Sequence, residues 1–393
     1  MPEVRDEAPI DRPTGPASDA HGPSPDACVH GGAFFDAIGD AFDDLSRRER
    51  VVNADVLDAW FPPSPKALAA LREHLDWLVR TSPPTHAEGL ARTVARVRGV
   101  PEACLLTAAG SSDLIFLAMR EWLTPSSRAL VLDPTYGEYE HVLGNVVGCR
   151  VDRFPLARED GYDLDVERLG RTIRAERYDL VALVNPNSPT GRHAPRAALE
   201  AMLGRVPLST RVWIDETYID FAASSASLET FAALRPNVVV SKSLSKAYAL
   251  SGLRAAYLCA DAALLAPLRR LTPPWAVSLP AQVAAVKALE DVAYYDARWR
   301  ETAVLREALA RDLAVRLRAE VVPSTTNFVL FHLPDDAPTA ADVVERVRRA
   351  GLYVRDASAI GSGLGPRAIR IAVKDARTNA WMVDRLAEAL VGR

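Results

Sequence analysis

The sequence predicts an α/β protein built on an open, mostly parallel sheet. Between about residues 100 and 260, short apolar runs alternate with helical patterns, which is the order of elements in such a fold. Most of these runs are continuously apolar, as expected for strands that are covered on both faces. Polar residues follow several of the runs directly, and parallel sheets bind their ligands at the carboxyl ends of their strands.

The predicted strands of this sheet follow one another along the chain. They occupy residues 127–134, 178–185, 211–216, 237–241 and 255–260. Stretches with helical periodicity lie between them, for example at residues 112–123 and 194–203.

The pattern changes after about residue 295. We expect a long charged amphipathic helix at residues 298–317, a strand at 327–331, a helix at 340–350, strands at 353–355 and 368–373, and a final helix. This order predicts a smaller α+β domain.

Four parts are expected along the chain. Residues 1–27 are rich in Pro, Asp, Gly and Ala without a hydrophobic period, which predicts a flexible tail or an arm ordered only by a partner subunit. Residues 28–75 are expected to form an N-terminal arm and part of the small domain. Residues 76–290 are expected to form the large domain, and residues 291–393 the C-terminal small domain.

Charge and composition exclude several classes of protein. The net charge is −4, and acidic and basic residues are interleaved without the basic stripe of a nucleic-acid-binding protein. No apolar run is long enough to span a bilayer, and the N-terminus lacks the pattern of a secretory signal. The four cysteines are widely scattered, which favours buried thiols over disulfides or a metal site. We therefore predict a cytoplasmic protein without a metal.

One lysine stands out because lysine is rare in this chain. There are only five lysines against 42 arginines, yet Lys246 is kept just after the predicted strand at 237–241, among small hydroxyl residues. An arginine guanidinium stays protonated and does not form a Schiff base, so a lysine at this position indicates that its amine is needed as a nucleophile.

Other polar groups follow the predicted strands. Asp215 to Tyr218 follow one strand, and residues 185–191, 133–136 and 241–246 follow three others. Residues 110–113 open a helix, where free N–H groups favour a phosphate. Each fragment alone has an ordinary explanation as a helix cap or a turn. Together they bring an amine, a phosphate cradle, a carboxylate and a phenol to one crevice.

These segments resemble a known family. The chain is similar to fold-type I, class I/II aminotransferases that depend on pyridoxal 5′-phosphate (PLP), and most similar to the branch of histidinol-phosphate aminotransferase and threonine-phosphate decarboxylase. The resemblance rests on residues 185–191, 215–221 and 243–254 in this order, and it covers roughly residues 50–390. It implies a three-layer fold with a large, mostly parallel sheet domain that binds PLP, a smaller α+β domain, and a homodimer.

The resemblance implies roles for individual residues. Lys246 would hold PLP as a Schiff base and then carry the proton between the substrate Cα and the cofactor. Asp215 would pair with the pyridine nitrogen, and Tyr218 would bond the phenolate oxygen. The cofactor phosphate would be bound by Ser111, Ser112, Ser243, Ser245 and Arg254.

Three further assignments concern the ring and the substrate. Tyr136 matches the aromatic residue that stacks on the pyridine ring, and Arg370 matches the arginine that clamps the substrate α-carboxylate. Asn187 is assigned the second contact to the phenolate oxygen and a place beside the substrate. Ser188 is the alternative, because many relatives have asparagine directly before Pro-Thr-Gly.

The N-terminal part departs from the family pattern. Residues 57–65 replace the usual Asn-Pro-Tyr-Gly segment, and Ser82 stands where relatives have a tyrosine that reaches the partner subunit's cofactor. We assign Trp60 to the substrate pocket, together with Phe61, Phe34 and His30. Ordinary packing of an N-terminal arm is the alternative.

Three functions follow from these observations. The first is transamination of an amino acid or an amino alcohol phosphate. The second is a specialised biosynthetic PLP reaction on an amino acid conjugate, namely decarboxylation, oxidative deamination or β-elimination with C–S cleavage. The third, a ligand-sensing module of a regulator, is disfavoured because no DNA-binding extension is present and Lys246, Asp215 and Arg254 are retained.

Overall fold

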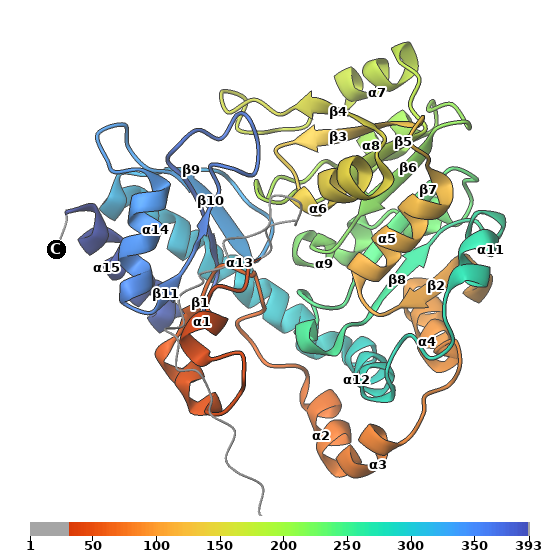
Figure 1. The fold of residues 1–393 in the computed structure, drawn as a ribbon, viewed down its shortest axis with the longest axis horizontal. Helices are drawn as coiled ribbons and strands as arrows, with labels where there is room; N and C mark the ends of the chain where they lie inside the picture. Colours follow the sequence, from red (N-terminus) through yellow and green to blue (C-terminus); the bar gives the residue numbers. More distant parts are fainter. Residues whose placement is uncertain (1–30, 392–393) are drawn as a thin grey trace, which may run out of the picture.

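The structure is a computed structural model that describes residues 31–391. Its largest element is a seven-stranded sheet with the strand order β2-β8-β7-β6-β5-β3-β4 (Figure 1). The strands are β2 (Leu105–Ala108), β3 (Arg128–Asp133), β4 (Arg150–Pro155), β5 (Leu180–Val184), β6 (Arg211–Asp215), β7 (Val238–Ser243) and β8 (Ala256–Cys259).

The sheet is mostly parallel, as predicted. The pairs β3–β4, β3–β5, β5–β6 and β6–β7 are parallel, and β8 runs antiparallel to both of its neighbours. In register, Val184 lies opposite Asp215, which in turn lies opposite Ser241. The carboxyl ends of β5, β6 and β7 therefore meet at one edge of the sheet.

Both faces of the sheet are covered, which explains the continuous apolar runs. Side chains alternate between two hydrophobic cores: Val212 and Ile214 point into one core, and Trp213 points into the other. The core around Trp213 is closed by α5 (Ser111–Trp122), the π-helix η3 (His141–Val147) and α11 (Ala262–Leu271). Helices that close the other core include α4 (Glu88–Arg98), α7 (Val166–Ala175), α8 (Arg196–Leu203) and α12 (Leu279–Leu289).

A smaller α+β unit follows in the chain. Its antiparallel sheet has the order β12-β13-β10-β9, with β9 (Glu320–Val321), β10 (Phe328–His332), β12 (Arg355–Asp356) and β13 (Ala368–Ala372). Helices α13 (Val292–Leu317), α14 (Ala340–Arg349) and α15 (Ala376–Leu390) accompany it (Figure 1). Thr339 and Asp342 form a capping box at the start of α14, and Asp375 caps α15, so both helices begin at polar residues.

The N-terminal segment contacts both parts of the molecule. Strand β1 (Val52–Asn53) pairs in parallel with β11 (Leu352–Tyr353), whereas α2 (Pro65–Glu73) packs against α12. Two short helices, α1 (Phe35–Ile38) and η1 (Leu45–Arg50), precede β1, and α3 (Leu75–Arg80) follows α2. The expected domain boundaries near residues 76 and 291 stay predictions, and the expected tail at residues 1–27 lies outside the described residues.

Two sequence-based expectations need correction. The strand expected at residues 353–355 is two strands, because Leu352–Tyr353 pairs with β1 while Arg355–Asp356 pairs with β13. The helix expected from residue 298 already begins at Val292.

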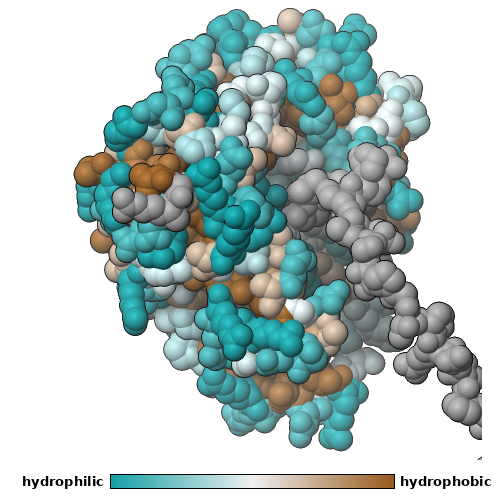
Figure 2. Space-filling view, turned by 60° about the vertical axis from the view of Figure 1, so that its left-hand side comes forward, coloured by the Kyte–Doolittle hydropathy of each residue, from teal (hydrophilic) through white to brown (hydrophobic). Residues whose placement is uncertain are grey.

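The outer surface is mixed in character. The face in Figure 2 is largely hydrophilic, with hydrophobic residues in small separate groups. No helix in residues 31–391 is long and apolar enough to cross a membrane.

Candidate active site

The predicted amine lies beyond the carboxyl end of β7, and its contacts come from the N-terminal segment. Lys246 Nζ donates to the Val56 carbonyl oxygen and to Asp58 Oδ1, both at 2.9 Å. The side chain is only 17% exposed. Burial lowers the pKa of this amine, and the carboxylate of Asp58 opposes that shift. Lys246 is therefore a shielded amine that is easier to deprotonate than an ordinary lysine.

A buried carboxyl group lies at the end of the neighbouring strand. Asp215 Oδ2 accepts a hydrogen bond from the Tyr139 hydroxyl at 2.8 Å, and Oδ1 accepts from the Thr217 amide at 2.9 Å and its hydroxyl at 2.6 Å. Trp213 Nε1 donates to the Tyr139 hydroxyl at 2.8 Å and so fixes its orientation. Burial raises the pKa of Asp215 in spite of these hydrogen bonds.

The predicted phosphate-binding residues meet at the start of α5. Gly110 is the N-cap residue with φ +100°, and a Cβ at this position would lie 2.6 Å from Arg254 Nη2. Only glycine therefore fits beneath the guanidinium group. Arg254 also donates to the Ser251 carbonyl oxygen at 3.0 Å and lies 3.4 Å from Ser245 Oγ.

The serines complete this arrangement. Ser111 and Ser112 occupy the first turn of α5, whose N–H groups have no side-chain cap. Ser243 Oγ accepts from the Ser245 amide at 3.2 Å. The free N–H groups of a helix N-terminus, two hydroxyl-bearing segments and a guanidinium group form a cradle suited to a phosphate.

Two tyrosines lie near Asp215. The Tyr136 ring contacts Tyr139 edge to face at 6.0 Å, and its hydroxyl donates to the carboxylate of Glu138. The Tyr218 ring packs edge-on against Phe328 with centroids 5.1 Å apart. Burial raises the pKa of both phenols, so both are neutral at physiological pH.

The predicted carboxylate clamp lies on β13. Arg370 is buried, and it donates from Nη1 to Ser188 Oγ at 3.1 Å and from Nη2 to the Asp55 carbonyl oxygen at 2.9 Å. Its Nε has no hydrogen-bond partner within residues 31–391. Burial, reinforced by the nearby Arg355, lowers the pKa of Arg370 to about 10. An anionic ligand would offset this burial of charge.

The amide of Asn187 is already occupied within the chain. Asn187 Nδ2 donates to the Pro134 carbonyl oxygen at 2.9 Å and to Thr190 Oγ1 at 3.1 Å, and its oxygen accepts from Thr135 at 2.9 Å. Ser188, the alternative, instead presents its hydroxyl to the clamp arginine. The choice between Asn187 and Ser188 for the contact to the phenolate oxygen stays a prediction, and of the two only Ser188 contacts Arg370.

The aromatic residues of the N-terminal segment are engaged in packing. Trp60 Nε1 donates to Thr302 Oγ1 at 2.8 Å, so its polar edge is directed to α13. Phe61 is buried against two tyrosines of the same helix. The Phe34 ring lies tilted against the neighbouring Phe35 ring with centroids 4.4 Å apart, and His30 lies outside the described residues. These contacts favour the packing alternative, and the assignment of Trp60 to the substrate pocket stays a prediction.

Sequence reasoning missed two charged residues of the site. Asp58 contacts Lys246, and Lys374 Nζ lies 3.5 Å from the Asp58 carbonyl oxygen. Burial lowers the pKa of Lys374 to about 8. The scarcity of lysine, which pointed to Lys246, applies equally to Lys374 and would have found it.

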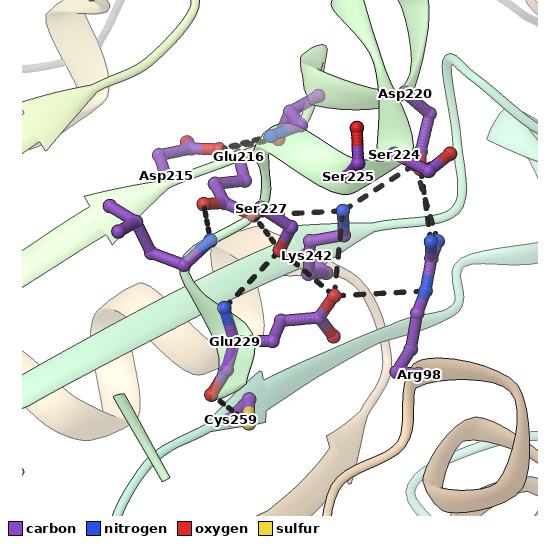
Figure 3. A network of polar contacts seen from close by, with 12 residues as sticks. Arg98, Asp215, Glu216, Asp220, Ser224, Ser225, Ser227, Glu229, Lys242 and Cys259 are labelled. Atoms are coloured by element: carbon purple, nitrogen blue, oxygen red, sulfur yellow. Dashed lines mark hydrogen bonds and ion pairs between the residues drawn. The ribbon is translucent and has the colours of Figure 1, made fainter. Parts of the chain in front are cut away.

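A second buried lysine lies four residues before Lys246. Lys242 Nζ is surrounded by Asp220 at 3.5 Å, Glu216 at 3.7 Å and Glu229 at 3.9 Å (Figure 3). Arg98 of α4 joins the group through Asp220 at 3.1 Å and Glu229 at 3.7 Å. The cluster joins β7 to the residues that follow Asp215. The Lys242 amine is surrounded by carboxylates and is not exposed to a ligand.

The cluster holds three carboxyl groups and two cations. Burial raises the pKa of Glu216 to about 7, and the nearby Glu229 adds to the effect of burial. Burial also disfavours ionised Asp220, but Arg98 and Lys242 outweigh it and hold the pKa of that carboxyl at about 2. When Glu216 is protonated, the two remaining carboxylates balance the charges of Arg98 and Lys242.

The arrangement fits PLP on two observations of the chain itself. Among the described residues, no cationic side chain forms an ion pair with Asp215, so a protonated pyridine nitrogen would supply the missing charge. The space above Gly110, which a Cβ would fill, lies under a guanidinium group suited to a phosphate. Lys246 supplies the amine. These features define the class of the protein as a PLP-dependent enzyme.

Comparison with known proteins agrees. Residues 55–390 match the family described as aminotransferase class I and II, and the chain belongs to this family. Histidinol-phosphate aminotransferase 2 of Ralstonia nicotianae is 34% identical over 329 residues, which cover 82% of this chain and 84% of that protein.

Solved structures give the same fold. The histidinol-phosphate aminotransferase of Sinorhizobium meliloti, in complex with pyridoxal-5′-phosphate, is 26% identical with a TM-score of 0.77 and covers 88% of this chain and 92% of that chain. The L-threonine-O-3-phosphate decarboxylase of Porphyromonas gingivalis is 24% identical with a TM-score of 0.75, covers 87% of this chain and 100% of that chain, and supports the fold alone. The protein is a fold-type I, PLP-dependent aminotransferase.

Proposed function

We propose that this aminotransferase acts on an amino acid-type substrate whose acid group is bound by Arg370 and whose amino group is exchanged beside Lys246. One observation carries the proposal. The Lys246 amine and the Arg370 guanidinium bond the adjacent carbonyl oxygens of Val56 and Asp55, at 2.9 Å each. An amine and a cationic clamp this close suit a substrate with both groups on one carbon.

The cofactor would be held at its pyridine nitrogen, its phenolate oxygen, its ring face and its phosphate. Asp215 would pair with the pyridine nitrogen, and Tyr218 and Ser188 would bond the phenolate oxygen. Tyr136 would stack on the ring. The phosphate would be bound by Ser111, Ser112, Ser243, Ser245 and Arg254. When bound, PLP supplies an electron sink for negative charge at the substrate Cα.

The reaction itself would depend on two cationic side chains. Arg370 would bind the substrate carboxylate through charge-assisted hydrogen bonds and orient the Cα–H bond. The lowered pKa of Lys246 provides a fraction of neutral amine that can accept the Cα proton and return it at the end of the transfer.

The test is an amino-transfer assay on the wild type and on Arg370→Ala. Holoenzyme is incubated with amino acids or histidinol phosphate, with and without 2-oxoglutarate, and the products are analysed. We expect glutamate to form in the wild type. In Arg370→Ala, kcat/KM for α-carboxylate substrates should fall about 10²-fold, since charge-assisted hydrogen bonds contribute about 1.5–3 kcal/mol each.

Bound cofactor, followed by its absorbance, should be unchanged in this variant. Arg377→Ala, an exposed arginine at the start of α15, is the matched control and should behave as the wild type. Release of carbon dioxide without glutamate formation would contradict the proposal, and so would unchanged kinetics of Arg370→Ala.

We also propose a cytoplasmic homodimer. Large apolar side chains are exposed on α3, at the end of α11 and in the loop that follows it, namely Trp77 (49%), Val79 (72%), Leu271 (51%) and Trp275 (57%). The backbone N–H of Trp275 donates to the Thr85 carbonyl oxygen, so the loop after α11 is bonded to the loop that follows α3. A second copy covering these residues would remove them from water. The buried free thiols of Cys104, Cys149 and Cys259 suit a reducing compartment.

Light scattering should give twice the chain mass of 42.7 kDa. Trp275→Asp should shift the dimer towards monomer, because the carboxylate would be buried in the interface. A monomeric wild type at micromolar concentration would refute the dimer.

A further inference from the structure

The Lys246 amine has two close partners from the N-terminal segment. It bonds a backbone carbonyl and the carboxylate of Asp58, at 2.9 Å each. Under the proposed function, this amine would have to be uncombined when it accepts the Cα proton. Asp58 is therefore the carboxylate that lies within hydrogen-bond distance of this amine.

We propose that Asp58 is a positioning residue that holds the free amine of Lys246 in the site and sets the pH range in which that amine is active. The inference rests on the proposed function of Lys246. The neutral amine takes the Cα proton and becomes an ammonium group, while the electron pair of the C–H bond stays with the substrate. Asp58 then faces this ammonium group directly.

The charges around the amine explain why a carboxylate is needed. Burial, and to a smaller extent Arg370 and Arg254, disfavour the ammonium form of Lys246 and lower its pKa, and Asp58 opposes them. Burial also disfavours ionised Asp58, but Lys246, a hydrogen bond with Ser251, and Lys374 outweigh it and keep its pKa below the usual value. Asp58 thus stays a carboxylate over the whole range in which Lys246 titrates.

A merely structural role for Asp58 is not required, because the segment around it is held by other contacts. The carbonyl oxygen of Ala54 accepts from the Ala372 amide, and that of Asp55 accepts from Arg370. The carbonyl oxygen of Leu57 accepts from Asn327 Nδ2 at 2.8 Å. The Asp58 side chain is 36% exposed and anchors no helix, so its carboxylate is available for Lys246.

The test measures the pKa of the lysine directly. Holoenzyme labelled with ¹⁵N-lysine is saturated with a 2-methyl amino acid, which binds through its amine but has no Cα proton to lose. With five lysines in the chain, the Lys246 resonance is the one that appears on binding and is absent from Lys246→Ala. In Asp58→Asn its pKa should fall by about one unit, because the amide does not stabilise the ammonium form.

Kinetics provide a second readout. Turnover requires the neutral amine, so the acid limb of the kcat–pH profile should also move about one pH unit lower in Asp58→Asn. Asp58→Glu should restore both values towards the wild type, and Asp36→Asn, an exposed aspartate of α1, should change neither.

Two outcomes overturn the inference: an unchanged lysine pKa in Asp58→Asn, or an Asp58→Glu variant that behaves as Asp58→Asn. A failure of the proposed function looks different, because then no lysine resonance responds to the substrate analogue in any variant.

Discussion

Replacing Lys246 by alanine should lower kcat by about 10³-fold or more and abolish the covalent attachment of PLP. Positioned proton transfer alone contributes about 10²–10⁴-fold, and the same amine is the group that forms the Schiff base. The methyl side chain offers neither the nucleophile nor the proton acceptor. Steady-state rates give the first effect. Borohydride reduction followed by peptide mass spectrometry gives the second.

The chain offers a matched control for this experiment. Lys287 of α12 is 46% exposed and pairs with Glu290, so Lys287→Ala should keep full activity and a reducible cofactor. If Lys246→Ala still carried one reducible PLP per chain, Lys246 would not be the cofactor lysine.

Replacing Arg98 by alanine should destabilise the protein by about 3–5 kcal/mol, because removing one partner of a buried ion-pair cluster leaves uncompensated charge. Arg98 lies 3.1 Å from Asp220 and 3.7 Å from Glu229, and its side chain is 8% exposed (Figure 3). Without it, Lys242 alone faces three carboxyl groups. Urea unfolding at a fixed PLP concentration, followed by tryptophan fluorescence and circular dichroism together, measures the loss.

The control lies two residues away on the same helix. Arg96 is 62% exposed and pairs with Glu290 at 2.7 Å, so Arg96→Ala should cost less than about 1 kcal/mol. Equal shifts of the unfolding midpoint in the two variants would show that the buried cluster contributes no more than a surface pair.

The ion pairs of Asp220 should also make the stability of the protein depend on pH. The folded-state pKa of Asp220 is held at about 2, below its ordinary value of 3.8. Its contribution is therefore complete above about pH 4 and is lost as the pH falls towards 2. In Arg98→Ala the folded-state pKa rises, and this part of the acid dependence should largely disappear.

The sequence predicted the central strands well, since buried parallel strands are continuously apolar. The strands expected at residues 211–216 and 237–241 correspond to β6 and β7, with ends that differ by at most two residues. It missed β2, which has only four residues, and β4, an edge strand with largely exposed side chains. The single strand expected at residues 353–355 is divided because its two ends find different partners, and pairing partners are a tertiary property.

The site was predictable to the extent that it lies at strand ends. Asp215 is the last residue of β6, and Lys246 lies three residues after β7, so the order of these parallel strands already places both at one edge of the sheet. The contact between Lys246 and Asp58 joins residues 188 positions apart, and no local pattern encodes it. The orientation of Ser188 relative to Asn187 depends on the turn conformation, which the letters Asn-Pro-Asn-Ser-Pro-Thr-Gly do not determine.

The segment from Ala54 to Asp58 has a consequence for the evolution of this enzyme. Arg370 donates to the carbonyl oxygen of Asp55, and Lys246 donates to that of Val56, the next residue in the chain. Under the proposed function, a substitution that shifts this segment to admit a bulkier substrate would also displace the Lys246 amine. Substrate selectivity and the position of the lysine amine would therefore change together. New substrates would be gained more readily by substitutions outside these five residues than within them.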